Sequence, residues 1–184
     1  RGDRAVADAE PLVDHLHHRR QAVGGAGGGG HDAMARRVVE MVVHAHHHVQ
    51  HALVLHRRGD HHARHALRQV GDNNLNGKIL IDIANPLDFS RGMPPSLAVS
   101  NTDSLGEQIQ REFPQVKVVK TLNTVTASLM VNPGQLDNGE HHIFLSGNDP
   151  AAKSQVAGWL AKWFGWKHIL DLGDISTARG TEMY

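Results

Sequence analysis

The stretch Lys78–Pro86, KILIDIANP, decides the fold of the second part of this 184-residue chain. Its first seven residues form a short, mostly apolar and β-branched run, which is typical of a buried strand. Asn85-Pro86 ends that run, because proline has no amide hydrogen to donate and restricts the backbone of the residue before it. We therefore expect a buried strand that opens directly into a loop.

Helix and strand signals alternate from this strand to the end of the chain. In TDSLGEQIQREF, residues 102–113, Ser104 and Glu107 have the spacing of a capping box, which predicts a helix. Asp149 is a cap for a second helix that ends at Gly165. That helix carries an apolar stripe formed by Val156, Trp159, Leu160, Trp163 and Phe164, which predicts core packing. Further strands are expected at Val116–Lys120, His141–Gly147 and Lys167–Asp174, and a last helix is expected from Ile175.

This alternation predicts an α/β fold of the Rossmann-like kind, with a mostly parallel sheet and helices on both faces. In such sheets ligands bind beyond the carboxyl ends of the strands, and this rule selects the loops Ala84–Pro86 and Thr121–Thr124. Asparagine and threonine there suit a carboxamide or a ribose, but they are also ordinary turn formers. Pattern alone therefore gives an incomplete sheet with two candidate loops.

The composition changes sharply near Asp72, and residues 1–72 differ from an ordinary globular domain. They contain no Phe, Trp, Tyr, Ile, Lys, Ser, Thr or Asn, yet they hold thirteen of the sixteen histidines and ten of the thirteen arginines. The residue types that remain have mostly GC-rich codons. We interpret this His/Arg/Gly-rich region as translated from another frame or strand, with disorder as the alternative, and expect irregular or helical structure in the N-terminal third. Residues 73–184 are expected to form the domain.

Two motifs in residues 1–72 suggest a function. His47 and His51, in the His-rich tract 44–51, stand one helical turn apart and would suit a transition metal, but no acidic partner is nearby. Gly25–Gly30 fits the G-x-G-x-x-G pattern of a dinucleotide phosphate loop, with Ala52–Leu55 as a later strand. A polar, cationic segment precedes these glycines where a buried strand is required, so we interpret the match as chance. Because the histidines lack an acidic partner, we also predict no metal site.

Charge and composition exclude several other classes. The formal net charge is zero, which gives no support to a nucleic-acid partner or an acidic membrane surface. The chain has no cysteine, which fits a cytoplasmic protein, and no apolar run reaches the ~18 residues that a membrane-spanning helix needs. It starts with Arg1, which we interpret as a sign of a processed or incomplete chain.

From about Leu75 to Tyr184 the chain resembles the NADPH-dependent reductases of the deazaflavin coenzyme F-420. More broadly, it is similar to the NADP oxidoreductase superfamily that includes the cytosolic domain of eukaryotic metalloreductases. The resemblance rests on four motifs in the family's order, of which no single one would be specific. They are ID-x-x-NP, VVKTLNT, SGNDP-x-AK and DLGD-x-x-x-AR-x-x-E. Residues 1–72 do not match.

The resemblance implies NADP(H) as the dinucleotide and reversible hydride transfer to coenzyme F-420 or a flavin-like ring. It places Ala84, Asn85 and Pro86 beside the nicotinamide and its ribose, and Asn123 and Thr124 in the pocket where the two rings meet. No catalytic acid or base is nominated, since the cofactors carry the chemistry. Four charged residues of the last motif are expected to cap helices and form salt bridges: Asp171, Asp174, Arg179 and Glu182.

Two departures from the family bear on activity. The family's first strands and phosphate loop have no clear counterpart here, and the family continues beyond Tyr184, so we expect a truncated or inactive fragment that binds NADPH poorly or not at all. A non-catalytic Rossmann fragment and a ferric or flavin reductase are the alternatives. Small-molecule cofactors are the expected partners, and a homodimer is left open.

Overall fold

The computed structural model describes residues 52–55 and 60–184, which contain a five-stranded sheet. Three of the four neighbouring strand pairs are parallel, and β5 and β6 are antiparallel, so the expected mostly parallel sheet is confirmed. Across the sheet the strands follow in this order: β1 (Ala52–Leu55), β2 (Ile79–Asp82), β5 (Lys117–Thr121), β6 (His142–Ser146) and β7 (His168–Asp171).

The antiparallel pair follows from the connection between β5 and β6. A parallel neighbour needs a long crossover, usually a helix that returns along the whole sheet. Here the chain makes only α5 (Ala127–Val131) and two single 3₁₀ turns, η2 (Pro133–Gln135) and η3 (Asp137–Gly139). The chain therefore re-enters the sheet near the end of β5, and β6 runs back along it with Ser146 opposite Lys120.

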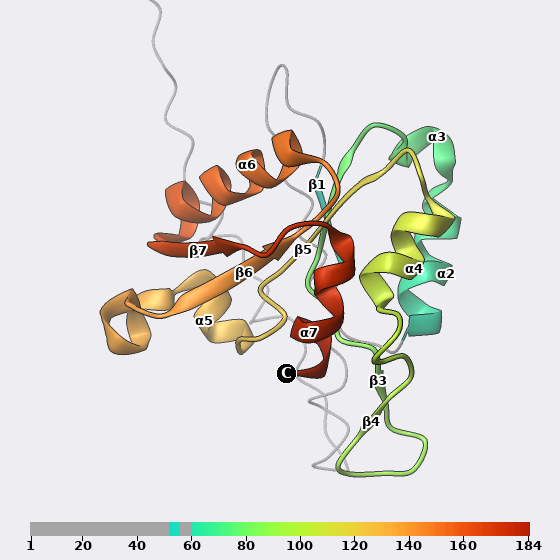
Figure 1. Ribbon diagram of the computed structural model, residues 1–184, viewed down its shortest axis with the longest axis horizontal. Coiled ribbons are helices and arrows are strands. Elements are labelled where there is room, and N and C mark those ends of the chain that lie inside the picture. The colour runs from blue at the N-terminus through green and yellow to red at the C-terminus, as the bar shows by residue number, and fades with distance from the viewer. Residues whose placement is uncertain (1–51, 56–59) are drawn as a thin grey trace, which may run out of the picture. The chain divides into compact units, whose positions relative to one another are not determined.

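Helices cover both faces of the sheet, as expected (Figure 1). The residues of β2 alternate between two cores: Ile79 and Ile81 pack on the side of α6 (Pro150–Trp159), and Leu80 packs on the opposite side. Four helices contribute buried residues to that opposite side: α2 (Asp60–Val70), α3 (Asp72–Leu75), α4 (Leu105–Glu112) and α7 (Ala178–Met183). Burial on both faces explains why β2 is apolar with so little interruption.

The predicted helix signals correspond to real caps. The hydroxyl of Ser104 accepts a hydrogen bond from the amide of Glu107 at 3.1 Å, and the Asp149 carboxylate accepts one from the amide of Ala152 at 2.7 Å. Gly165 ends the second helix in the left-handed conformation, with φ 81°.

The expected core position of Trp163 is wrong. The helix changes from α6 to a π-helical turn, η4 (Leu160–Phe164), and in this wider turn Leu160 and Phe164 still pack against the core whereas Trp163 does not. Trp163 is therefore exposed and stacks on Trp159, with ring centroids 5.5 Å apart. Trp166, just after the turn, is buried instead and donates its indole N–H to the carbonyl of Met130.

Part of the chain before Asp72 belongs to the same fold. Strand β1 pairs in parallel with β2, and Ala63 and Leu67 of α2 are buried in the core on the α4 side. Residues 1–51 and 56–59, which include Gly25–Gly30 and His44–His51, lie outside the described residues. The interpretation of their origin and function stays a prediction.

Two small elements complete the described fold. After β2 the chain forms a separate antiparallel pair, β3 (Leu87–Asp88) and β4 (Ser96–Leu97), which extends beyond the sheet in Figure 1. After β7, the 3₁₀ turn η5 (Ile175–Thr177) leads into α7. The expected last helix is thus confirmed.

Gly147, just after β6, lies where the backbone closely approaches the neighbouring strand β5. A Cβ at this position would lie 2.7 Å from the backbone carbonyl oxygen of Val118, so Gly147→Ala should force a shift and lower the free energy of unfolding by about 1–3 kcal/mol. Gly158→Ala is the control, because no atom lies within 4 Å of its added methyl group and alanine favours a helix. Urea unfolding would contradict this account if both variants were equally stable.

Candidate functional site

The two candidate loops meet at the carboxyl edge of β2 and β5. These strands are parallel neighbours with Asp82 beside Lys120, so their following loops leave the sheet at the same edge. Asn85 Nδ2 donates to the carbonyl oxygen of Asn123 at 2.9 Å, and Asn123 Nδ2 donates to Asn85 Oδ1, also at 2.9 Å. The structure therefore brings together the residues that the sequence placed in one site.

The five predicted site residues differ in their access to solvent. Asn85 and Thr124 are half-buried, whereas Ala84, Pro86 and Asn123 are buried. A ligand at this edge would meet the side chains of Asn85 and Thr124 first. Of the buried three, Ala84 and Asn123 form hydrogen bonds that hold the loops in position.

The loop after β5 has a strained backbone. Leu122 adopts φ 61°, in the left-handed region that non-glycine residues rarely enter, while its side chain is buried in the core. Such a conformation costs about 1–3 kcal/mol and persists only where neighbouring contacts enforce it. This turn directs Asn123 toward Asn85 and toward α7, where its Nδ2 also donates to the carbonyl oxygen of Thr181 at 2.8 Å.

A buried ionic cluster lies directly beneath this edge. Lys120 Nζ lies 3.0 Å from Asp82 Oδ2 and 2.8 Å from Glu182 Oε1, and it also donates to the carbonyl oxygen of Ala84. All three charged side chains are almost completely excluded from solvent. One cation therefore faces two carboxylates in the core.

Burial and pairing act against each other in this cluster. Burial alone would lower the pKa of Lys120, but the two carboxylates outweigh it, so that pKa lies above its ordinary value. Burial raises the pKa of Glu182, and the negative charge of Asp82 adds to that effect against the opposing influence of Lys120. The lysine thus stays charged, and Glu182 is harder to ionise than an exposed glutamate.

Glu182 also anchors α7 to the start of α4. Its carboxylate accepts hydrogen bonds from the amides of Leu105 and Gly106, at 2.7 and 3.1 Å, where the first amides of a helix lack partners within the helix. Nearby, Arg179 Nε donates to Glu107 Oε2 at 2.8 Å, and this hydrogen bond lowers the pKa of Glu107. The expected capping and salt-bridge roles of Glu182 and Arg179 are confirmed.

The other two residues of that motif behave in the same way. Asp171 pairs with Lys153 at 2.7 Å, and the Asp174 carboxylate accepts the amide of Ser176 at 2.9 Å at the start of η5. These carboxylates hold loops and turns in place. Both carboxylates are therefore already bonded to groups of the protein itself.

Asp82 and Lys120 were missed as site residues by sequence reasoning. Asp82 is the one charge in β2, Lys120 follows the two buried valines of β5, and strand pairing puts these two charges side by side. Because a buried charge is tolerated only with a partner, two such interruptions in neighbouring strands are a usable signal for an internal ion pair. That signal requires knowing which strands are neighbours.

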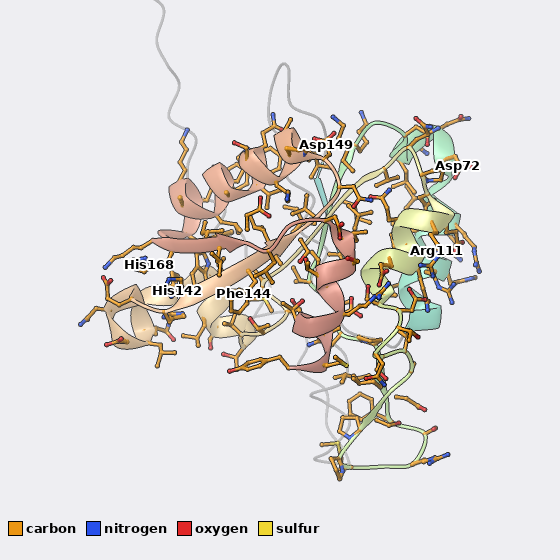
Figure 2. The ribbon with its side chains drawn as sticks, in the orientation of Figure 1. Asp72, Arg111, His142, Phe144, Asp149 and His168 are labelled. Carbon is orange, nitrogen blue, oxygen red and sulfur yellow. The ribbon has the colours of Figure 1, made fainter. Side chains whose placement is uncertain are left out.

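A second, separate feature is an open polar hollow of about 450 Å³ on the outer side of α2 and α4, lined by Arg64, Gln108, Arg111 and Glu112. Arg111, labelled in Figure 2, forms two hydrogen bonds with the Asp103 carboxylate, at 2.9 and 2.7 Å. Glu112 pairs with Arg64 and Arg68. The charges around this hollow therefore largely neutralise one another.

The histidines in the described part of the chain form no metal centre. His142 and His168 lie at the amino ends of β6 and β7, visible in Figure 2, with ring centroids 4.9 Å apart, and His168 Nε2 contacts Glu140 at 2.8 Å. Within residues 52–55 and 60–184, no three metal-binding side chains converge. None of the helices described there is both long and apolar enough to cross a membrane.

Comparisons with known proteins agree with the motifs in the sequence. No family model matches the chain. One solved structure is that of "a putative F420 dependent NADP-reductase" from Arthrobacter sp. FB24. Its sequence is 61% identical to this chain, and the two structures match with a TM-score of 0.66 over 68% of this chain and 57% of the Arthrobacter chain. A hypothetical protein from Sinorhizobium meliloti is 28% identical, with a TM-score of 0.50, over 67% of this chain and 58% of its own.

Metalloreductase STEAP3 of Rattus norvegicus is a more distant relative in sequence. It is 30% identical over 111 residues, which are 60% of this chain and 20% of the rat protein. The chain therefore spans a fifth of this curated relative and less than two thirds of either solved structure. The predicted resemblance to the F-420-dependent NADP reductases, and more distantly to metalloreductases, is confirmed.

Asn123 should hold the two loops and α7 together. Asn123→Ala removes the donor to the buried Thr181 carbonyl and to Asn85, and it should lower the free energy of unfolding by about 1–3 kcal/mol. Asn74→Ala removes an exposed hydrogen bond of the same kind and should cost less than about 0.5 kcal/mol. Equal losses in chemical denaturation would contradict the proposed contact between the loops.

The Asp103–Arg111 pair predicts a dependence on acid. The Arg111 hydrogen bond lowers the pKa of Asp103 from 3.8 to about 2, so its stabilisation is present above 3.8 and is lost as the pH falls toward 2. Because Arg111 is mostly exposed, Asp103→Asn should lower the free energy of unfolding by no more than about 1 kcal/mol at neutral pH. Urea unfolding should show this difference vanish near pH 2, and Arg111→Gln should behave alike. A difference that is constant with pH would contradict the pairing.

Proposed function

We propose that this chain is part of an NADP-dependent oxidoreductase that transfers hydride between NADP(H) and the deazaflavin coenzyme F-420. The observation that carries the proposal is the meeting of the loops Ala84–Pro86 and Asn123–Thr124 at the carboxyl edge of a sheet. Ligands of α/β sheets bind at this edge. The similarity at 61% identity to the Arthrobacter protein supports the choice of cofactors.

The chemistry of the edge fits the nicotinamide end of a dinucleotide. Asn85 and Thr124 are half-buried and carry neutral donors and acceptors, which suit a carboxamide and ribose hydroxyls. The nearby charges of Lys120, Asp82 and Glu182 are buried and paired with one another, so the side chains of this edge that remain partly accessible, Asn85 and Thr124, are uncharged. When bound, NADP(H) and the deazaflavin supply the hydride chemistry, and the protein's contribution is to orient them.

We further propose that the chain, as its sequence stands, binds NADPH weakly. The diphosphate of a dinucleotide is normally held by the amides of a glycine-rich loop after a buried strand. In residues 1–72, the segment before Gly25 lacks the apolar character of such a strand. The dinucleotide would then depend on contacts at its nicotinamide end. A cytoplasmic location and small-molecule partners are part of the same proposal.

A second candidate function is the reduction of ferric iron or flavin. The similarity to rat metalloreductase STEAP3 favours it, because that protein is named for metal reduction. Both functions would use the same nicotinamide edge, and they differ in the acceptor. The acceptor is therefore the variable that an experiment must change.

The test is a comparison of acceptors at one fixed, millimolar concentration of NADPH. The purified chain should oxidise NADPH at least about tenfold faster with coenzyme F-420 than with flavin mononucleotide or ferric citrate, measured from loss of deazaflavin or nicotinamide absorbance. A faster rate with flavin or ferric citrate would favour the second function. Calorimetry should show NADPH binding in the millimolar range, and micromolar binding would overturn the proposed weakness.

A further inference from the structure

Lys120 is connected to both candidate loops and to α7. It lies in β5, immediately before the turn Thr121–Thr124. Its ammonium group donates to the carbonyl oxygen of Ala84, the first residue of the other loop. The same group pairs with Glu182 of α7 at 2.8 Å. Its side chain thus contacts two of the three segments that surround the candidate site, and its backbone leads directly into the third.

Ala84, the first residue of the loop after β2, is held at both its backbone amide and its backbone carbonyl oxygen. Asp82 Oδ1 accepts the amide of Ala84 at 3.0 Å, and Lys120 Nζ binds the carbonyl oxygen of that residue while pairing with Asp82 Oδ2. The peptide groups on either side of Ala84 are therefore fixed. Since Asn85 follows directly, this arrangement sets the direction in which its side chain leaves the backbone.

The last turn of α7 fixes the second loop in a matching way. Thr181 offers its carbonyl oxygen to Asn123 Nδ2, and the next residue, Glu182, binds Lys120. Glu182 is itself held by the first amides of α4. The two asparagines are therefore placed against each other from both sides, and Lys120 is the group that links the two sides.

Stability alone does not account for three charges in this position. Removing charges from water is costly, and apolar replacements of a buried ion pair are often as stable as the pair. On the same face of the sheet the neighbouring positions Leu80 and Val118 are apolar and fully buried. An ion cluster differs from such packing because its hydrogen bonds are directional. Here they determine where the carbonyl and the amide of Ala84 point.

We propose that Lys120 is a positioning residue for the nicotinamide end of the dinucleotide. Through Ala84 and Glu182 it holds Asn85 and Asn123 in the mutual arrangement that receives the carboxamide and ribose. It touches no reacting atom. This inference rests on the proposed function for its ligand, while the holding of the loops is a property of the chain alone.

Lys120→Met is the direct test, and Lys153→Met is its matched control. Lys153 is also nearly buried and also bridges a carboxylate and a backbone carbonyl, those of Asp171 and Gly173, but it lies in α6 away from the two loops. If Lys120→Met fails to fold, Lys120→Met with Glu182→Gln replaces it, because this pair of changes leaves one fewer unpaired carboxylate.

Two measurements are made on each folded variant. The first is amide hydrogen exchange at residues 84–85 and 122–124 without ligand. The second is the affinity for reduced nicotinamide mononucleotide, which lacks the adenosine half and needs no diphosphate loop. Lys120→Met should raise exchange in both loops and weaken the affinity by about tenfold or more, whereas Lys153→Met should do neither.

Each outcome decides the proposal. Unchanged exchange in the loops, unchanged affinity, or equal effects of the two lysine variants would overturn it, since a general loss of stability would then explain the data. If the wild-type chain does not bind the mononucleotide, the proposed function fails at this edge. The exchange comparison then decides by itself whether Lys120 holds the two loops.

Discussion

The contact between Lys120 and its two carboxylates is the interaction on which the described site depends. It joins neighbouring strands through Asp82, and it joins the sheet to the C-terminal helix α7 through Glu182. Because the ammonium group also binds the carbonyl oxygen of Ala84, the same contact determines where the loop after β2 begins. The edge of the sheet is therefore shaped from within the core. The charges that organise this edge are buried, and Asn85 and Thr124, which stay partly accessible there, are uncharged.

Much of this arrangement follows from local sequence. The spacing of Ser104 and Glu107, the cap at Asp149 and the glycine at 165 each predict a feature that the structure contains, because caps depend on residues within one turn. The pairing of the loops Ala84–Pro86 and Asn123–Thr124 also follows, since adjacent parallel strands must place their carboxyl ends together. Whether those five residues bind a cofactor stays a prediction.

Other features depend on contacts between distant segments and could not be read from the pattern. Trp163 lies in a π-helical turn and is exposed, although it belongs to an apolar stripe whose other members pack in or against the core. The ion cluster combines residues from β2, β5 and α7, and none of these segments contains the opposite charge that pairs with its member of the cluster in the core. Strand β1 shows that part of the unusual N-terminal composition still contributes to the sheet. In each case the deciding partner lies far away in the chain.

The most direct test of this account is to map where reduced nicotinamide mononucleotide binds by nuclear magnetic resonance on the isotope-labelled chain. If the nicotinamide end binds at this edge, chemical-shift changes should centre on Asn85 and Thr124, with smaller changes at Asn123 and at Thr181 in α7. Changes centred on the hollow beside Arg111, or an absence of changes at the carboxyl edge of β2 and β5, would contradict it.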